Sequence, residues 1–256
     1  MPNNAKLTFK MDKSITPRQY METLGVFHYY AGQAKFLASL INKNGMRGKC
    51  KILDVGCGIG TLLSKINSSF PGFYSIATGI DQNKAFIEYC RNLELPNAKF
   101  YKTKFEDFKP VEKYDIVLFT AYISQSSENL VEFRRFIKSA FGMLTDNGMV
   151  IFSFIDSIMY ANKYDYGAFK LRMPDGSNFI ANGLAEPGKN NKLIFELTFT
   201  NRKTGYMITS KAQYIYLTRK KIKHMFDGSY SVKFKSGHKN GLPDDKTAYW
   251  CILKRL

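Results

Sequence analysis

The sequence predicts an α/β fold in which a doubly wound, mostly parallel sheet carries an antiparallel β-rich insertion. Three observations support this prediction. Between residues 49 and 156, short apolar runs alternate with helix-like segments. The runs are apolar throughout, which is typical of strands covered by helices on both faces. After residue 156 apolar and polar residues alternate, as expected for antiparallel strands with one buried face.

The composition excludes several classes of protein. The chain has 256 residues, of which 45% are hydrophobic, so a disordered chain is excluded. The length suits one large domain or one domain with an insertion. No apolar run approaches the ~20 residues of a membrane-spanning helix. The N-terminal segment lacks the apolar centre of a secretory signal, and we therefore expect a cytoplasmic protein with no membrane partner.

Strands and helices alternate through the predicted core, residues 49–156. The expected strands are 51–55, 74–80, 99–102, 114–120 and 149–154. The expected helices are 61–70, 83–93 and 129–144, the last closed by a turn at Asp146-Asn147-Gly148. Residues 1–48 are expected to form an N-terminal helical lid segment, because apolar residues recur at helical spacing between Ala31 and Asn42.

The remaining chain divides into an insertion, 157–216, and a C-terminal part, 217–256. The insertion shows two hairpin patterns, 169–173 with 178–181 and 192–200 with 206–216. The C-terminal part starts with an expected helix, Thr218 to Phe226, in which Thr218 is the N-cap. Two strands at 230–235 and 247–254 complete the core sheet.

The net charge of +17 comes from 29 Lys and 9 Arg against 21 acidic residues. Specific nucleic-acid readers depend on Arg for bidentate contacts, so this Lys-rich balance fits a generally basic surface equally well. Nucleic acid is therefore a partner that stays open but is not favoured. The four cysteines and three histidines share no zinc-site spacing, and no metal site is predicted.

The most informative segment is a buried strand, Ile52–Val55, that runs into the turn Gly56-Cys57-Gly58-Ile59-Gly60 and then into a helix. Glycines let the backbone approach a ligand closely, and a helix N-terminus adds N–H donors and a partial positive charge. The pattern predicts a nucleotide site at the carboxyl end of the sheet. Thr61 occupies the last position of the dinucleotide fingerprint, and no Lys-Ser/Thr follows as in a P-loop.

The segment Asp54-Val-Gly-Cys-Gly-Ile-Gly60 resembles the first motif of the class I S-adenosylmethionine-dependent methyltransferases, in which a strand precedes an acid-x-Gly-x-Gly-x-Gly turn. The resemblance continues in order over roughly residues 48–155. It implies a seven-stranded, Rossmann-like methyltransferase fold. It also implies S-adenosyl-L-methionine as cofactor and S-adenosyl-L-homocysteine as product.

The resemblance also implies roles for individual residues. Asp81 ends the second strand, where the family holds the ribose hydroxyls, and Lys104 stands where many members carry an acid for adenine. The cofactor-binding residues implied are Asp54, Gly56, Cys57, Gly58, Gly60, Asp81, Gln82, Phe105, Glu106, Phe119 and Thr120. Two alternatives stay open: a dinucleotide site, since Asp81 would suit an NAD ribose, and a glycine turn that serves packing alone.

The acceptor side carries weaker signals. The segment after the fourth strand has no proline motif and no cysteine, which disfavours base-flipping N-methylation and 5-methylcytosine chemistry. The aromatic cluster before the first strand looks like the lid of small-molecule methyltransferases, or it packs a helix. The catalytic candidates are His28 as a general base, with Tyr29 and Tyr122 lining an acceptor pocket.

The favoured hypothesis is a small-molecule N- or O-methyltransferase that works by direct in-line displacement. One alternative is an RNA methyltransferase, acting on a cap or a tRNA, that uses the basic surface. A second is a catalytically silent cofactor-binding subunit. The insertion resembles in position the acceptor-covering insertions of glycine N-methyltransferase-like enzymes. It would cover the acceptor or mediate an oligomer contact, and we expect a monomer or homodimer.

Overall fold

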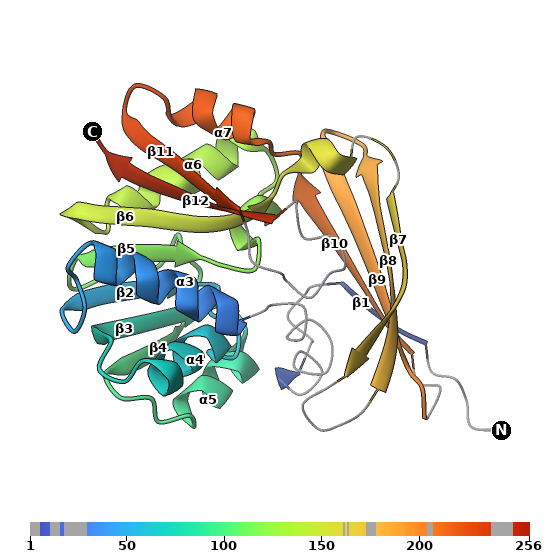
Figure 1. The fold of residues 1–256 in the computed structure, drawn as a ribbon, viewed down its shortest axis with the longest axis horizontal. Helices are drawn as coiled ribbons and strands as arrows, with labels where there is room; N and C mark the ends of the chain where they lie inside the picture. Colours follow the sequence, from blue (N-terminus) through green and yellow to red (C-terminus); the bar gives the residue numbers. More distant parts are fainter. Residues whose placement is uncertain are drawn as a thin grey trace.

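The computed structural model describes residues 6–10, 16–17, 30–160, 162, 164–172, 178–203, 207–236 and 248–256. Two sheets lie side by side, a seven-stranded one flanked by helices and a five-stranded one (Figure 1). In the described part of the chain, no helix is both long and apolar enough to cross a membrane.

The seven-stranded sheet confirms the predicted mostly parallel core. Its strand order is β11-β12-β6-β5-β2-β3-β4. The bounds are β2 Cys50–Val55, β3 Tyr74–Asp81, β4 Ala98–Lys102, β5 Tyr114–Phe119, β6 Leu144–Ile155, β11 Tyr230–Ser236 and β12 Ala248–Arg255. Strands β2 to β6 pair in parallel, whereas β12 runs antiparallel to both β6 and β11. The order reverses beside β2, which is where α/β sheets of this kind bind ligands.

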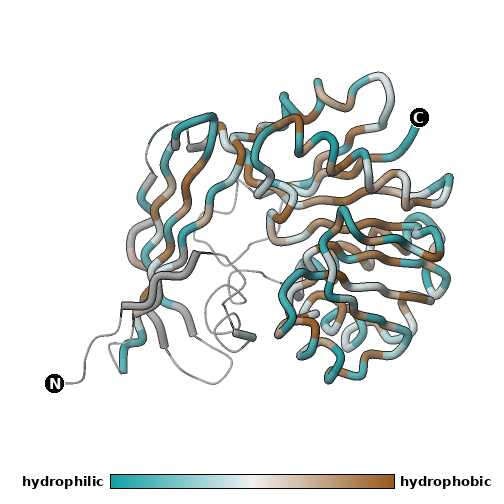
Figure 2. Tube along the Cα trace, turned by 180° about the vertical axis from the view of Figure 1, so that it is seen from behind, coloured by the Kyte–Doolittle hydropathy of each residue, from teal (hydrophilic) through white to brown (hydrophobic). Residues whose placement is uncertain are grey.

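Helices cover both faces of this sheet because alternate residues of each strand point to opposite sides. In β2, Ile52 packs with α3, α4 and α5, whereas its neighbour Leu53 packs with α6 and α7. The helix bounds are α3 Tyr30–Lys43, α4 Thr61–Ser69, α5 Lys84–Arg91, α6 Leu130–Phe141 and α7 Arg219–Phe226. The strands between them are strongly hydrophobic (Figure 2). The continuous apolar runs of the sequence are therefore strands covered on both faces.

The five-stranded sheet has the order β1-β10-β9-β8-β7. Its bounds are β1 Lys6–Lys10, β7 Tyr164–Arg172, β8 Asn178–Gly188, β9 Lys192–Asn201 and β10 Met207–Ile215. Strands β7 to β10 are antiparallel, as predicted for the insertion. Strand β1 was not predicted: it lies in the segment expected to be a helical lid, and it pairs in parallel with β10.

One predicted turn is wrong. Asp146-Asn147-Gly148 does not separate α6 from a strand, because β6 already begins at Leu144 and runs through it. The pairing with β5 slips here, since Tyr114 faces Leu144 whereas Ile116 faces Met149. Asp146 and Asn147 are exposed. The polar residues therefore bulge outward within one strand, and α6 ends at Phe141 instead of residue 144.

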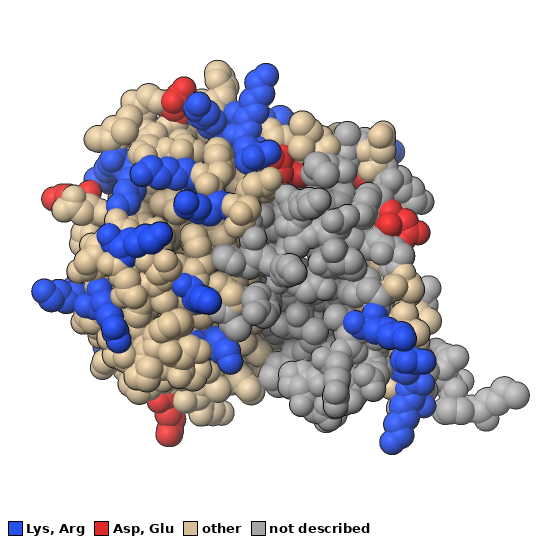
Figure 3. All heavy atoms as spheres, in the orientation of Figure 1, with Lys and Arg blue, Asp and Glu red and all other residues tan. Residues whose placement is uncertain are grey.

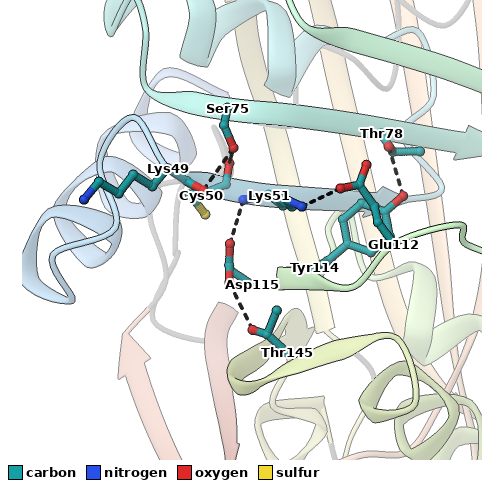
Figure 4. Close-up of polar contacts among 9 residues, drawn as sticks. All are labelled: Lys49, Cys50, Lys51, Ser75, Thr78, Glu112, Tyr114, Asp115 and Thr145. Carbon is teal, nitrogen blue, oxygen red and sulfur yellow. Dashed lines mark hydrogen bonds and ion pairs between the residues drawn. The ribbon is translucent and has the colours of Figure 1, made fainter.

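A polar cluster joins the amino ends of three core strands (Figure 4). The Asp115 carboxylate accepts a hydrogen bond from the Lys51 backbone N–H at 2.9 Å and another from the Thr145 hydroxyl at 3.0 Å. These contacts tie the beginnings of β2, β5 and β6 together. Asp115, the second residue of β5, therefore lies at the sheet edge opposite the glycine turn.

Candidate functional site

The three motif glycines form the turn between β2 and α4 in left-handed backbone conformations. The φ angles are 68° at Gly56, 56° at Gly58 and 73° at Gly60. Such angles are strained for residues with a Cβ. The backbone N–H groups of Gly56 and Cys57 both donate to the Ile80 carbonyl, at 2.8 and 3.0 Å. The turn is therefore held against the carboxyl end of β3.

Close packing gives two of these glycines a second reason to lack a side chain. A Cβ on Gly56 would lie 2.9 Å from Ile123 Cγ1, and one on Gly60 would lie 3.1 Å from Cys90 Sγ. The Cys57 side chain is buried beneath the turn, and burial raises the pKa of its thiol. The Cys57 thiol donates to the Gly58 carbonyl at 3.7 Å, so the side chain is part of the buried packing of the turn.

Asp81 links the end of β3 to the glycine turn. Its carboxylate accepts from the Gly58 N–H at 3.0 Å and from the Asn83 N–H at 2.8 Å. Burial raises the pKa of Asp81, and the hydrogen bonds from the backbone of Asn83, Gly58 and Gln82 oppose that rise. The structure thus fixes one carboxylate at the sheet's carboxyl edge.

Asp54, the first residue of the motif, is completely buried, and neither of its carboxylate oxygens has a hydrogen-bond partner among the described residues. Burial, with a smaller effect from the charge of Asp81, raises the pKa of Asp54 to about 8. A buried carboxyl without partners is costly to ionise. This group therefore has unmet capacity for a hydrogen bond or a cation.

A cavity of about 510 Å³ opens beside the turn, a size typical of small-molecule sites. Five of the predicted cofactor-binding residues line it: Gly56, Asp81, Gln82, Phe105 and Glu106. The other lining residues are Val55, Ile80, Thr103, Lys104, Ile123, Ser126, Ser127, Glu128, Glu132 and Phe136. The structure therefore brings the ends of β2 and β3 and the segment after β4 around one space.

The remaining predicted cofactor residues lie outside this lining: Asp54, Cys57, Gly58, Gly60, Phe119 and Thr120. Phe119 is fully buried, and its ring packs against Phe105 and Phe136 at centroid distances of 5.4 and 4.9 Å. Since Phe105 and Phe136 both line the cavity, Phe119 supports its wall from behind.

One wall of the cavity contains none of the predicted site residues. It comes from residues 123–128 and the first turns of α6. Asn129 caps α6, with its side chain accepting from the Glu132 N–H at 2.9 Å, and the Glu132 carboxylate accepts from the Glu128 N–H. This is a capping arrangement that the Asn-x-x-Glu spacing indicates. The Asn-x-x-Glu spacing follows the strand β5 closely in the sequence. It was therefore the signal that could have indicated a second wall of the cavity.

Among the catalytic candidates, His28 and Tyr29 lie outside the described residues. Tyr122 is described, and it is 8% exposed. Its ring packs edge-on against Tyr214 of β10 at a centroid distance of 6.0 Å, and it belongs to a buried cluster with Phe195 of β9. Tyr122 thus contacts the inserted sheet and is not part of the cavity lining.

Within the described residues, no group of three or more His, Cys, Asp or Glu is placed to hold a metal ion. All four cysteines are described, and each is a buried free thiol.

The basic residues are widely distributed. On the face shown in Figure 3, Lys and Arg side chains are scattered over the α/β core, with a closer group at the top where Figure 1 places α7. That helix carries Arg219, Lys220, Lys221 and Lys223. Arg219 is already paired with Asp156, at 2.8 Å. The cavity, in contrast, is lined by four acidic side chains and one Lys.

Comparisons with known proteins agree with this geometry. Residues 47–168 match the model of a methyltransferase domain family. A malonyl-[acyl-carrier protein] O-methyltransferase of Ilyobacter polytropus is 24% identical over 147 residues, which cover 56% of this chain and 53% of that protein. The chain thus matches about half the length of this curated relative.

Two solved structures are similar over most of the chain. An S-adenosylmethionine-dependent methyltransferase from Clostridium acetobutylicum has a TM-score of 0.69 at 12% identity, covering 93% of this chain and 96% of that one. The S-adenosylmethionine-bound amino pentose methyltransferase of Micromonospora echinaspora has a TM-score of 0.68 at 15% identity, covering 87% and 91%. Residues 47–168 are therefore a methyltransferase domain, and the chain has the fold of the class I S-adenosylmethionine-dependent methyltransferases.

Proposed function

We propose that this protein binds S-adenosyl-L-methionine in the cavity beside the glycine turn and transfers its methyl group to a nitrogen or oxygen of a small-molecule acceptor. One observation carries the proposal: a left-handed three-glycine turn and the Asp81 carboxylate meet at one edge of a cavity of about 510 Å³.

The residues present fit such a cofactor. The ribose diol needs a hydrogen-bond acceptor, and Asp81 is an acceptor that already lines the cavity. The cofactor carries a sulfonium and an ammonium group, and the lining has the side chains of Asp81, Glu106, Glu128 and Glu132 against the single cation Lys104. Gly56 lines the cavity without a side chain, and a Cβ there would crowd Ile123, which lines the same cavity. Shape and charge therefore support the same ligand.

When bound, the sulfonium supplies an already activated methyl group. The task of the chain is then to orient the reactants and to exclude water. The hydrogen bonds from Gly58 and Asn83 fix the Asp81 carboxylate, so that it can hold a ribose without reorganising. The buried Phe105–Phe119–Phe136 cluster keeps one wall apolar. These features favour alignment of the methyl group and do not require a residue that reacts covalently.

The relatives support a small acceptor. Their printed names include an amino pentose methyltransferase, a sugar N-methyltransferase and a malonyl-[acyl-carrier protein] O-methyltransferase, so nitrogen and oxygen acceptors both occur among similar proteins. We therefore propose the class, N or O of a small molecule, with His28, Tyr29 and Tyr122 as the candidates for contacts to it.

Calorimetry tests the cofactor half of the proposal. S-adenosyl-L-homocysteine and S-adenosyl-L-methionine should bind, and NADH should not. No heat of binding for either sulfur compound at millimolar concentration would refute the assignment, and tight NADH binding would favour the dinucleotide alternative.

Methyl-labelled cofactor tests the acceptor half. Incubated with a panel of amino sugars, amino acids and acyl thioesters, the protein should transfer label to a low-mass product. Label that instead enters RNA, with binding that weakens steeply as salt rises, would favour the RNA alternative.

A further inference from the structure

Gln125 occupies an unusual position for an amide side chain. It is fully buried, and it lies in η1 (Ile123–Ser126), the short 3-10 turn that follows β5. Its Nε2 donates to the Ile155 carbonyl at 3.0 Å and to the Ile215 carbonyl at 3.1 Å, while its Oε1 accepts from the Ile155 N–H at 2.9 Å. Its hydrogen-bonding capacity is therefore used chiefly on backbone groups.

The partners of Gln125 lie at the two crossings that bound the insertion, one after β6 and one after β10. Ile155 is the last residue of β6, where the chain leaves the core sheet, and Ile215 is the last residue of β10, before the chain returns to the core. The crossings also bond directly, because the Ser157 N–H donates to the Leu217 carbonyl at 2.8 Å and the Leu217 N–H donates to the Ser157 hydroxyl at 3.1 Å. Gln125 thus joins the end of β6 to the end of β10 by hydrogen bonds.

The residues on either side of Gln125 contact the cofactor cavity. Ile123 and Ser126 line the cavity, and Ile123 packs directly over Gly56. Ser127 also lines it, and its carbonyl accepts from the Lys192 ammonium of β9 at 2.8 Å. Residues 123–127 therefore contact both the cavity and the inserted sheet.

The backbone that enters the turn is strained. Ala121 and Tyr122 have φ angles of 51° and 60°, a region that residues with a Cβ rarely adopt. The Tyr122 N–H donates to the Ser153 hydroxyl at 3.2 Å, which helps to hold this conformation. Such geometry persists where surrounding contacts over-determine it, and it is common at sites that must be positioned closely.

We propose that residues 121–127, which we call the η1 turn, couple occupancy of the cofactor cavity to the order of the inserted sheet, with Gln125 as the positioning residue. A ligand that contacts Ile123 and Ser126 restricts the turn, and the Gln125 amide passes that restriction to the ends of β6 and β10. The inserted sheet is then firmly placed over the acceptor side only when the cofactor is bound. This inference rests on the proposed cofactor.

Hydrogen exchange with and without S-adenosyl-L-homocysteine tests the coupling. In the wild-type protein the ligand should slow exchange of β8 and β10 amides at least about threefold. In Gln125→Leu the ligand should bind with a dissociation constant within about threefold of wild type, and the slowing in β8 and β10 should disappear. A merely structural role would lower protection equally with and without ligand, and would leave the ligand-induced change intact.

A matched control separates coupling from general destabilisation. Thr78→Val removes the buried hydrogen bond that Thr78 accepts from Tyr114 at 3.0 Å, in the core sheet and remote from the crossings. It should keep the ligand-induced slowing. If Gln125→Leu does not fold, Ser157→Ala provides the same comparison, because it removes the hydroxyl that accepts from Leu217 at the crossing.

Three results would overturn the inference: a ligand-induced change in Gln125→Leu equal to that of wild type, an equal loss in Thr78→Val, or a wild-type protein that binds the ligand with no change in β8 and β10. A wild-type protein that does not bind the ligand would refute the proposed function instead. The two failures are therefore distinguishable.

Discussion

Replacing Asp54 by asparagine should change how the stability of this protein depends on pH. Burial raises the pKa of Asp54 from 3.8 to about 8 in the folded protein. Between about pH 4 and pH 8 the folded state therefore binds a proton that the unfolded state has released. Stability falls with rising pH wherever the folded state binds more protons, so Asp54 makes the wild-type protein less stable as the pH rises through this window.

The size of the effect follows from the shift. One pKa unit corresponds to about 1.4 kcal/mol. The three units between pH 5 and pH 8 therefore correspond to roughly 3–4 kcal/mol, slightly less than the full product because Asp54 is about half ionised at pH 8. That is a large part of the 5–15 kcal/mol typical of a folded domain. An asparagine amide has no proton to exchange, and the Asp54→Asn variant should lack this slope. Burial also raises the pKa of Asp81. Asp81 therefore lowers the stability of both proteins as the pH rises, and its effect does not distinguish them.

The assay is urea unfolding at pH 5, 6, 7 and 8, followed by circular dichroism for wild type and Asp54→Asn. The free energy of unfolding of the variant, relative to wild type, should grow by roughly 3–4 kcal/mol from pH 5 to pH 8. Parallel stability profiles for the two proteins would show that Asp54 ionises freely in the folded state, contrary to this prediction.

Two further predictions concern local structure. Gly56→Ala should lower the free energy of unfolding by about 1–2 kcal/mol, because it places a side chain at a φ of 68° and against Ile123; an unchanged urea midpoint would contradict this. Thr218→Ala should cost about 0.5–2 kcal/mol in the same assay, because the Thr218 hydroxyl caps α7 by accepting from the Lys221 N–H at 3.2 Å. Thr218→Ser should retain the stability, and a loss as large as that of Ala would argue against the cap.

The sequence predicted the core because its determinants are local. Apolar runs, glycine turns and caps such as Thr218 each act within a few residues, and the structure confirms the resulting strands and helices. The prediction of a turn at Asp146–Gly148 was wrong. Turn-forming residues can also bulge from a continuous strand, as they do here in β6 beside β5. Strand β1 was not predicted because it is short and pairs with residues far away in the sequence, Lys6 with Met207.

The site residues also differ in whether local sequence or long-range contacts determine their role. The motif made Gly56 and Asp81 recognisable, and both line the cavity. Gln125 could not be singled out, because its importance comes from Ile155 and Ile215, which only the fold brings to it. The position of Asp115 also needed the structure, which places the start of β5 at the sheet edge away from the glycine turn.

The central claim, that Asp81 holds the cofactor ribose, is tested most directly by calorimetric titration of S-adenosyl-L-homocysteine into Asp81→Ala and Asp115→Ala. Each substitution removes a hydrogen-bonded carboxylate, and the two carboxylates lie at opposite edges of the same sheet. Asp81→Ala should lose about 1.5–3 kcal/mol of binding free energy, roughly a tenfold to hundredfold weaker affinity, while Asp115→Ala should bind as wild type. Unchanged affinity in a folded Asp81→Ala, or an equal loss in Asp115→Ala, would contradict it.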